Sequence, residues 1–247
     1  MGELRPYWQS ADGSLTVYHA PCEAVIASVL PVREVALVHA DPPYGVNERT
    51  DRASKGRGFS RTRPGVASRD FPPVTGDRLP FDPAPLLALA RPTVLWGANH
   101  YSDRVPGSPS WILWDKREDT TPNDNADGEL AWTNLGGPLR IFRHLWNGLC
   151  RASEAGDRVL APTQKPIALS AYVFGRAKLK RGDLVFVPYL GSGPDLPAAQ
   201  AMGLRVICCD VEKWCLDTAI SRLGAITADR AAEPCGPLFA AVEPVRK

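Results

Sequence analysis

The chain has 247 residues, a length that suits one α/β domain or one domain with a sizeable insertion. Its apolar share of 44% permits a real core, and 29 basic against 27 acidic side chains leave a net charge of +2, which by itself neither indicates nor excludes a nucleic-acid partner. No apolar run reaches the length of a membrane span and the N-terminal segment MGELRPYWQS carries no signal-peptide pattern, so we expect a cytoplasmic protein that does not bind membranes. The six cysteines lack CxxC spacing and nearby histidines, which predicts reduced thiols and no metal site.

Short apolar strands alternate with helical segments along most of the chain. Strands are expected at residues 16–19, 34–40, 93–96, 111–114, 183–187 and 205–209. Helices are expected at residues 22–30, 85–90, 139–150, 166–177, 197–202 and 214–223. This alternation predicts an α/β fold, with a mostly parallel sheet and helices on both faces, in a single domain over residues 1–247.

The sequence Asp41-Pro42-Pro43-Tyr44 directly follows the strand expected at residues 34–40. The two prolines lack N–H donors, so the chain must leave the strand at once. The Asp41 carboxylate and the Pro42 carbonyl are acceptors without competing donors, and together they can hold both hydrogens of an amino group and turn its lone pair toward an electrophile. Tyr44 offers an aromatic face on which a flipped-out base can stack. The alternative is a tight proline turn without chemistry.

A second candidate site follows the strand expected at residues 183–187. Gly191-Ser192-Gly193 form a loop in which the absent side chains let a ligand approach the backbone. Asp210 ends the next strand, where an acid can accept both hydroxyl groups of a ribose. Together they indicate an adenosine-containing cofactor, against the alternative of a plain glycine turn. Both candidate sites lie at strand ends, where α/β sheets place their ligands.

Basic side chains are concentrated in a segment rich in Gly and Ser directly after Tyr44, and they predict a DNA-contacting loop over residues 47 to 80. The basic residues expected to contact DNA there are Arg49, Arg52, Lys55, Arg57, Arg61 and Arg63. Residues 115 to 150 are expected to form a small target-recognition insertion. Candidates for reading base edges there are Lys116, Arg117, Asn123, Asn125, Arg140 and Arg143. The alternative for both segments is a solvated surface. His100 and His144 have no partner at ligand spacing and are interpreted as structural or surface residues.

In this order the motifs resemble the amino-methylating DNA methyltransferases of the circularly permuted β group, and the middle segments look most like orphan methylases of phages and prophages. The collinear segments, between residues 14 and 223, are VHADPPYG, TVLWGANHYSDRVP, WILWDK, ELAWTN, IFRHLWNG, PTQKPIALSAYVF, GDLVFVPYLGSG and VICCDVEKW. The resemblance implies a Rossmann-like S-adenosylmethionine-dependent methyltransferase fold, with a seven-stranded sheet that has one antiparallel strand, and double-stranded DNA as partner. Because family members often pair, a homodimer is a candidate assembly, while a cognate restriction endonuclease stays unknown.

The resemblance also implies roles for individual residues. Asp41 and Pro42 accept from the amine of the base, with Pro43 in the same motif, and Tyr44 stacks on the base. In this family Asp at the first motif position usually accompanies adenine, whereas Ser more often accompanies cytosine. The implied cofactor-binding residues are Lys165, Pro188, Tyr189, Gly191, Ser192, Gly193, Asp195, Asp210 and Val211.

All departures from the family pattern lie on the cofactor side. The family usually has Asp where this chain has Val187, Asp where it has Pro21, and two threonines where it has Pro194 and Asp195. Each lost charge-assisted hydrogen bond costs roughly 1.5–3 kcal/mol, so two losses weaken cofactor binding by on the order of a hundredfold or more. These departures leave open a weak or non-catalytic DNA-binding protein on the same fold. Two further alternatives also stay open: an N4-cytosine methyltransferase, and a methyltransferase of RNA or protein glutamine.

Overall fold

The computed structural model describes residues 4–48, 50, 71–118, 126–147, 150–154, 157 and 159–230. Most of the predicted basic loop, at residue 49 and residues 51–70, and residues 119–125 of the predicted target-recognition insertion lie outside this description. Among the described residues, no helix combines the length and the apolar character that crossing a membrane requires.

Short strands and helices alternate along the described chain. The strands are β1 (Trp8–Gln9), β2 (Leu15–His19), β3 (Leu37–Ala40), β4 (Thr93–Trp96), β5 (Trp111–Asp115), β6 (Gly128–Thr133), β7 (Arg140–Arg143), β8 (Trp146–Asn147), β9 (Cys150–Arg151), β10 (Leu184–Val187) and β11 (Arg205–Asp210). The α-helices are α1 (Cys22–Ser28), α2 (Ala84–Leu87), α3 (Ile167–Arg176), α4 (Asp195–Met202) and α5 (Lys213–Arg230). The 3-10 turns are η1 (Leu30–Val32), η2 (Ala98–His100) and η3 (Ser102–Arg104).

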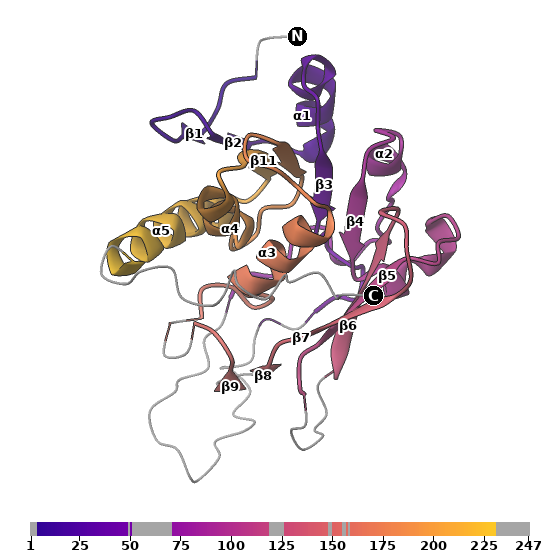
Figure 1. Cartoon of the computed structure of the whole chain (residues 1–247). Coiled ribbons are helices and arrows are strands. Elements are labelled where there is room, and N and C mark those ends of the chain that lie inside the picture. The colour runs from indigo at the N-terminus through magenta and orange to yellow at the C-terminus, as the bar shows by residue number, and fades with distance from the viewer. Residues whose placement is uncertain are drawn as a thin grey trace.

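The main sheet has the strand order β1-β2-β11-β10-β3-β4-β6-β5-β7, and β8 and β9 form a separate pair. From β2 to β5 the neighbours are parallel except at β6, which runs antiparallel to β4 and β5. The expected seven strands with one antiparallel member are therefore present, but seven is too few for the whole sheet, because β1 and β7 add one strand at each edge. Strands β2 and β11, far apart in the sequence, lie side by side (Figure 1).

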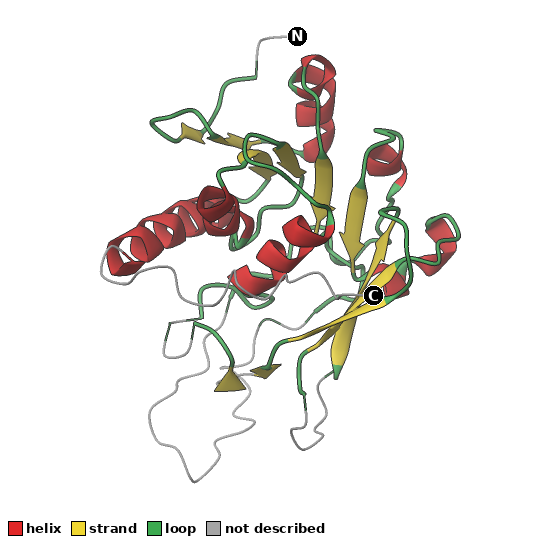
Figure 2. Ribbon diagram, viewed as in Figure 1, coloured by secondary structure: helices red, strands yellow, loops and turns green. Residues whose placement is uncertain are grey.

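The strands bury successive residues on opposite faces of the sheet, as their pleat requires. Leu37 and Val94 pack into an apolar cluster that includes residues of α3, α4 and α5. Val38 and Leu95, their chain neighbours, pack into a second cluster that includes residues of α1 and α2. The two groups of helices therefore cover opposite faces, which confirms the expected layered α/β architecture (Figure 2).

Most predicted elements are present with small shifts at their ends, but the helix expected at residues 139–150 is wrong. These residues contain β7, β8 and the first residue of β9. Leu139, Phe142 and Trp146 recur at a spacing that fits a helix. However, β7 pairs with β5, with Phe142 opposite Trp114, so tertiary pairing overrides the local pattern. Strand β6 is not predicted either, because the segment GELAWT shows no clear alternation of polar and apolar residues.

Candidate active site

The carboxyl ends of β3, β10 and β11 meet at one edge of the sheet, because these neighbouring strands are parallel. Asp41 follows β3, the glycine loop at residues 191–193 follows β10, and Asp210 ends β11. Asp41, Gly191 and Asp210 line one open cavity of about 2080 Å³. Pockets for one small molecule commonly measure roughly 300–1,000 Å³. The cavity therefore has room for more than one ligand.

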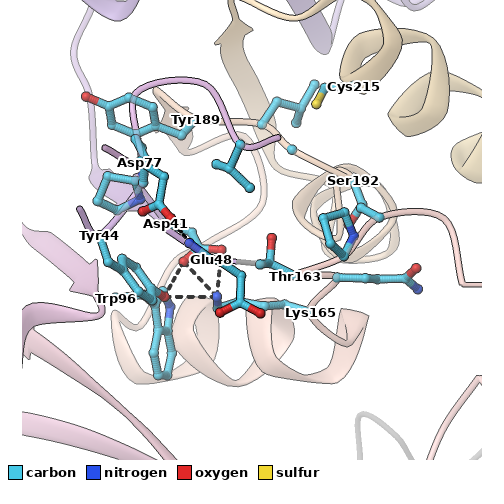
Figure 3. Close-up of a pocket in the computed structure, with 18 of the residues that line it drawn as sticks. Asp41, Tyr44, Glu48, Asp77, Trp96, Thr163, Lys165, Tyr189, Ser192 and Cys215 are labelled. Atoms are coloured by element: carbon cyan, nitrogen blue, oxygen red, sulfur yellow. Dashed lines mark hydrogen bonds and ion pairs between the residues drawn. The ribbon is translucent and has the colours of Figure 1, made fainter. Parts of the chain in front are cut away.

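At the Asp41 end of the cavity, two carboxylates and an ammonium group meet. Lys165 Nζ lies 2.7 Å from Oδ1 and 2.6 Å from Oδ2 of Asp41, and 3.0 Å from Oε2 of Glu129. The Tyr44 hydroxyl oxygen lies 2.6 Å from Asp41 Oδ1 and 3.1 Å from Lys165 Nζ (Figure 3). Lys116 forms an ion pair with the other oxygen of Glu129, so that two ammonium groups balance two carboxylates. We call these five residues the Lys165 cluster.

The surroundings of the Lys165 cluster determine its protonation. Burial lowers the pKa of Lys165, but Asp41 and Glu129 more than offset this and hold that pKa above its usual value. Burial raises the pKa of Glu129, whereas Lys165 and Lys116 lower it, and the result lies below the usual range. Burial and the nearby charges of Asp41 and Glu129 raise the pKa of Tyr44 well above its usual value. At neutral pH Lys165 and Glu129 are therefore charged, and Tyr44 is a neutral phenol that donates to Asp41.

The ring of Tyr44 lies against the backbone of Gly97 and the ring of His100. A Cβ atom at Gly97 would lie 2.1 Å from Cε1 of Tyr44, so only glycine fits at this point. Gly97 also has a φ of +69°, a left-handed conformation that favours glycine. The exposed ring of His100 stacks on Tyr44, with centroids 5.4 Å apart and an interplanar angle of 16°. His100 is thus a direct neighbour of the ring that is expected to stack on a base.

Asp77 holds the turn that follows Tyr44. Its Oδ1 accepts hydrogen bonds from the backbone N–H groups of Gly45 at 2.8 Å and Val46 at 3.3 Å, and its Oδ2 accepts from Glu48 at 2.6 Å. The aspartate is buried at 4% exposure. The sequence does not indicate this role, since a lone aspartate in a loop carries no signal of a distant partner.

The glycine loop leaves its backbone accessible at the cavity wall. A Cβ atom on Gly191 would meet no heavy atom within 4 Å. A Cβ atom on Gly193 would lie 2.4 Å from Ala219, so this second glycine permits the close packing of α5. Asp210 accepts hydrogen bonds from the backbone N–H groups of Gly191 and Glu212, both at 2.9 Å and on different oxygens. Each carboxylate oxygen keeps a second lone pair that a hydroxyl group can use.

The positions that depart from the family pattern have different surroundings. Val187 is buried in the sheet core, so its side chain is a packing residue. Pro21 lines the cavity beside Cys22, whose sulfur lies 3.3 Å from the Tyr189 hydroxyl group. Burial raises the pKa of Cys22 to about 11, so this thiol is neutral at physiological pH. Glu23, the next residue, also lines the cavity, so a carboxylate-bearing residue lies close to the positions of Pro21 and Cys22.

Asp195 is anchored to the sheet by a buried hydrogen-bond chain. The Trp96 indole N–H donates to His39 Nε2 at 2.9 Å, and His39 Nδ1 lies 2.6 Å from Asp195 Oδ1. An indole nitrogen only donates, so Nε2 is an acceptor and Nδ1 carries the proton that His39 donates to Asp195. Asp195 also lines the cavity. Its role toward a cofactor stays a prediction.

Arg222 connects the glycine loop to the segment that carries Lys165. Its Nη1 donates to the carbonyl and hydroxyl oxygens of Ser192, both at 3.3 Å, and its Nη2 donates to the Lys165 carbonyl at 3.3 Å. Arg222 also forms a buried ion pair with Glu154, which accepts from the Ile167 backbone N–H at 2.9 Å. The two ends of the cavity are thereby linked through one buried guanidinium group.

The structure describes four of the basic residues that are expected to contact DNA. Lys116 forms an ion pair with Glu129. Arg117 is 4% exposed, and its Nε lies 2.7 Å from Oδ1 of Asp127. Both cations are therefore paired within the protein. Arg140 and Arg143 are exposed on the edge strand β7. The other predicted DNA contacts lie outside the described residues, namely Arg49, Arg52, Lys55, Arg57, Arg61, Arg63, Asn123 and Asn125.

Sequence reasoning missed Glu129, Asp77 and Arg222. Glu129 lies in the segment ELAWTN, in strand β6 of the central sheet. A correct prediction of β6 would have placed this carboxylate in the sheet and marked it as a candidate. The long-range partners of Asp77 and Arg222 have no local pattern at all.

No protein-family model matches the chain. Its structure is similar to the crystal structure of the M1.HpyAVI–SAM complex, with a TM-score of 0.50 and 20% sequence identity over 85% of this chain and 100% of that chain. It is also similar to PvuII DNA methyltransferase (cytosine-N4-specific), with a TM-score of 0.56 and 11% identity over 96% of each chain. At these identities the likeness establishes the fold alone: the chain has the α/β fold of S-adenosylmethionine-dependent methyltransferases.

Proposed function

We propose that the chain is a site-specific DNA methyltransferase that transfers a methyl group from S-adenosylmethionine to the exocyclic N6 amine of adenine. The observation that carries this proposal is that Asp41 and Gly191 line the same cavity, at the ends of the neighbouring strands β3 and β10. One end presents acceptors for an amine, and the other presents open backbone and a carboxylate suited to a ribose. Two ligands that react must meet in one cavity, and its volume suffices for both.

The residues around the glycine loop fit S-adenosylmethionine. Open space at Gly191 admits close contact with the backbone, and Asp210 has a lone pair on each oxygen for the ribose hydroxyl groups. Val211 is 46% exposed and lines the cavity together with Pro188 and Tyr189, so a purine could cover apolar surface there. The bound cofactor would supply an electrophilic methyl group.

The base-binding end acts by positioning and by fixed charges. The Asp41 carboxylate and the Pro42 carbonyl accept the two hydrogens of the target amine, which turns its lone pair toward the methyl group. Tyr44 stacks on the base. When the lone pair of the nitrogen forms the new bond to the methyl carbon, the bond from that carbon to the cofactor sulfur would break, and its electron pair would pass to sulfur. The nitrogen, now positively charged, would release one proton to Asp41 or to water. Lys165 and Glu129 hold the surrounding charges in place, so little reorganisation accompanies the transfer.

Double-stranded DNA is the proposed partner, bound beside the cavity by a single catalytic domain. The exposed Arg140 and Arg143 belong to the proposed target-recognition insertion and are suited to contacts with phosphates or base edges. The basic segment that follows Tyr44 in the sequence would add phosphate contacts. Each phosphate contact releases counterions, so we expect binding to weaken steeply with added salt.

The test is transfer of tritium-labelled methyl groups from S-adenosylmethionine to unmethylated genomic DNA, followed by sequencing that detects modified bases. We expect N6-methyladenine in one sequence context. Asp41→Ala should abolish the transfer, whereas Asp103→Ala should retain it, because that carboxylate is 74% exposed and does not belong to the cavity. If the product contains N4-methylcytosine, the protein is an N4-cytosine methyltransferase and the assignment to adenine is wrong. An Asp41→Ala protein with parental activity would refute the assigned site.

A DNA-binding protein without catalysis is the second candidate, and the cofactor side favours it. Val187 is buried in the core and Pro21 has no polar side chain, so neither offers the acid that the resembling family has there. Calorimetric titration with S-adenosylmethionine separates the two functions. A dissociation constant in the micromolar range supports the enzyme, and absence of binding near millimolar concentration supports the non-catalytic protein.

A further inference from the structure

The side chains of Lys165 and Asp41 present a donor and an acceptor next to each other at the base-binding end of the cavity. We propose that they recognise the Watson–Crick edge of the target base, with Lys165 donating a hydrogen bond to the ring nitrogen beside the amine. This inference rests on the proposed function and makes Lys165 a residue that determines base specificity. The ring nitrogen is N1 in adenine and N3 in cytosine, and in both bases it is an acceptor next to an amino donor.

The spacing of the two groups suits such an edge. Oδ2 of Asp41 lies 2.6 Å from Nζ of Lys165, and both residues line the cavity (Figure 3). Thymine, when it pairs with adenine, likewise presents a carbonyl acceptor directly beside an N–H donor. The two side chains therefore offer a flipped-out adenine the same pattern that its partner offered in the duplex.

Lys165 has a proton available for the ring nitrogen. Its Nζ lies within hydrogen-bond distance of four oxygen atoms but carries only three protons, so its contacts are shared. The contact with the Tyr44 hydroxyl group is the longest, at 3.1 Å, and that hydroxyl group has Asp41 as its own acceptor at 2.6 Å. A base that enters can therefore take one proton of Lys165 while Asp41 and Glu129 keep the others.

Glu129 holds Lys165 in place when Asp41 engages the amine. The Asp41 side chain is 30% exposed, whereas those of Lys165 and Glu129 are 8% and 18% exposed, so Asp41 is more accessible to a ligand than these two residues. Lys116 pairs with Glu129 and fixes that carboxylate. Lys165 Nζ lies 5.5 Å from the centroid of the Tyr44 ring. A base stacked on Tyr44 would therefore have an edge within reach of Lys165.

This arrangement selects among the bases. Guanine and thymine carry an N–H group at the corresponding ring position, so the ammonium group of Lys165 would meet a second donor and no acceptor. Loss of a hydrogen bond to a buried charged group lowers the efficiency of transfer about 10- to 100-fold. Adenine and cytosine both satisfy the pair, so the choice between them depends on other parts of the cavity.

The test replaces single atoms of the base. Unmethylated DNA duplexes are prepared that contain the sequence context in which the protein methylates its target. The target position carries adenine, 1-deazaadenine or 7-deazaadenine. 1-Deazaadenine lacks the proposed acceptor, whereas 7-deazaadenine keeps the whole edge and serves as the control. If the methylated base is cytosine, 3-deazacytosine takes the place of 1-deazaadenine. The kcat/KM values are compared for the parent protein, Lys165→Met, and Lys165→Met with Glu129→Gln, which restores the charge balance of the cluster.

For the parent protein we expect 1-deazaadenine to lower kcat/KM about 10- to 100-fold relative to adenine, and 7-deazaadenine to stay near adenine. Both Lys165 variants should lose this discrimination, whatever their overall rate, and Glu129→Gln alone should keep it. Equal rates of the parent on adenine and 1-deazaadenine would overturn the proposal, as would undiminished discrimination in both Lys165 variants. The same comparison can be made without turnover. Fluorescence anisotropy measures the binding of single-stranded oligonucleotides that carry adenine, 1-deazaadenine or 7-deazaadenine at the target position. A parent protein that discriminates in binding but transfers no methyl group would refute the proposed function and leave the recognition by Lys165 intact.

Discussion

Replacement of Gly97 by alanine should disturb the candidate active site through a single added carbon atom. The new Cβ would lie 2.1 Å from Cε1 of Tyr44, and real contacts of this kind do not occur, so the ring or the turn must move. Left-handed backbone at a non-glycine residue costs about 1–2 kcal/mol. Overpacking adds about 1–3 kcal/mol. Because the displaced ring carries the hydroxyl group that contacts Asp41, methyl transfer should fall together with stability.

Gly182→Ala is the matched control. Gly182 has a φ of +88°, but a Cβ atom there would meet nothing within 4 Å, so this variant carries the backbone cost without the collision. Reversible urea unfolding of both variants therefore isolates the collision as a difference of about 1–3 kcal/mol, or roughly 2–12 °C in Tm for a chain of this size. Equal free energies of unfolding for Gly97→Ala and Gly182→Ala would refute the packing of Tyr44 against Gly97.

Three further variants test the supports of the cavity. Asp77→Ala removes the acceptor of three backbone N–H groups, so it should cost about 1.5–3 kcal/mol in urea unfolding and raise KM for DNA. Arg222→Met leaves Glu154 buried without its cation and should cost about 3–5 kcal/mol, part of which Glu154→Gln should restore in the double variant. Burial raises the pKa of Asp210 above its usual value, although the Glu212 and Gly191 N–H groups partly lower it, so cofactor affinity should be full above that pKa and fall as the pH drops through it. Calorimetry across a pH series measures this, and Asp210→Asn should remove the dependence.

Contrary results would be specific for each variant. If Asp77→Ala has the same free energy of unfolding as the parent protein, the turn after Tyr44 is stable without the Asp77 side chain. If the loss of unfolding free energy in the double variant equals the sum of the losses in Arg222→Met and Glu154→Gln, the two side chains do not stabilise each other. A cofactor affinity that stays constant while Asp210 is protonated would remove this carboxylate from the ribose site.

The location of the two candidate sites at strand ends could be predicted from the sequence because the signals for it are local. Two prolines after an apolar run force Asp41 and Tyr44 out of the strand, and a pair of glycines predicts a loop whose backbone a ligand can approach. The adjacency of these two sites then follows from the parallel sheet, since neighbouring parallel strands end at the same edge. The cavity that Asp41 and Gly191 both line agrees with that expectation.

The groups that surround this chemistry could not be predicted, because their partners are distant in the sequence. Glu129 reaches Lys165 only through the pairing of β6 with β4, and β6 itself has no clear alternation. The family resemblance implies that Lys165 binds the cofactor, whereas in the structure its ammonium group forms an ion pair with Asp41. The error at residues 139–150 has the same origin, since pairing with β5 decides the state of a locally ambiguous segment.

The strand order also bears on how the chain folds during synthesis. Strands β2 and β3 emerge early, but β10 and β11, which lie between them in the sheet, emerge after all other strands that the structure describes. Until then the edges of β2 and β3 that face this gap have no permanent partner, and unpaired edges readily join other chains. A nascent chain that stops before β10 would therefore be prone to aggregate. The Asp41 end and the glycine-loop end of the cavity therefore become neighbours only when β10 and β11 insert between β2 and β3.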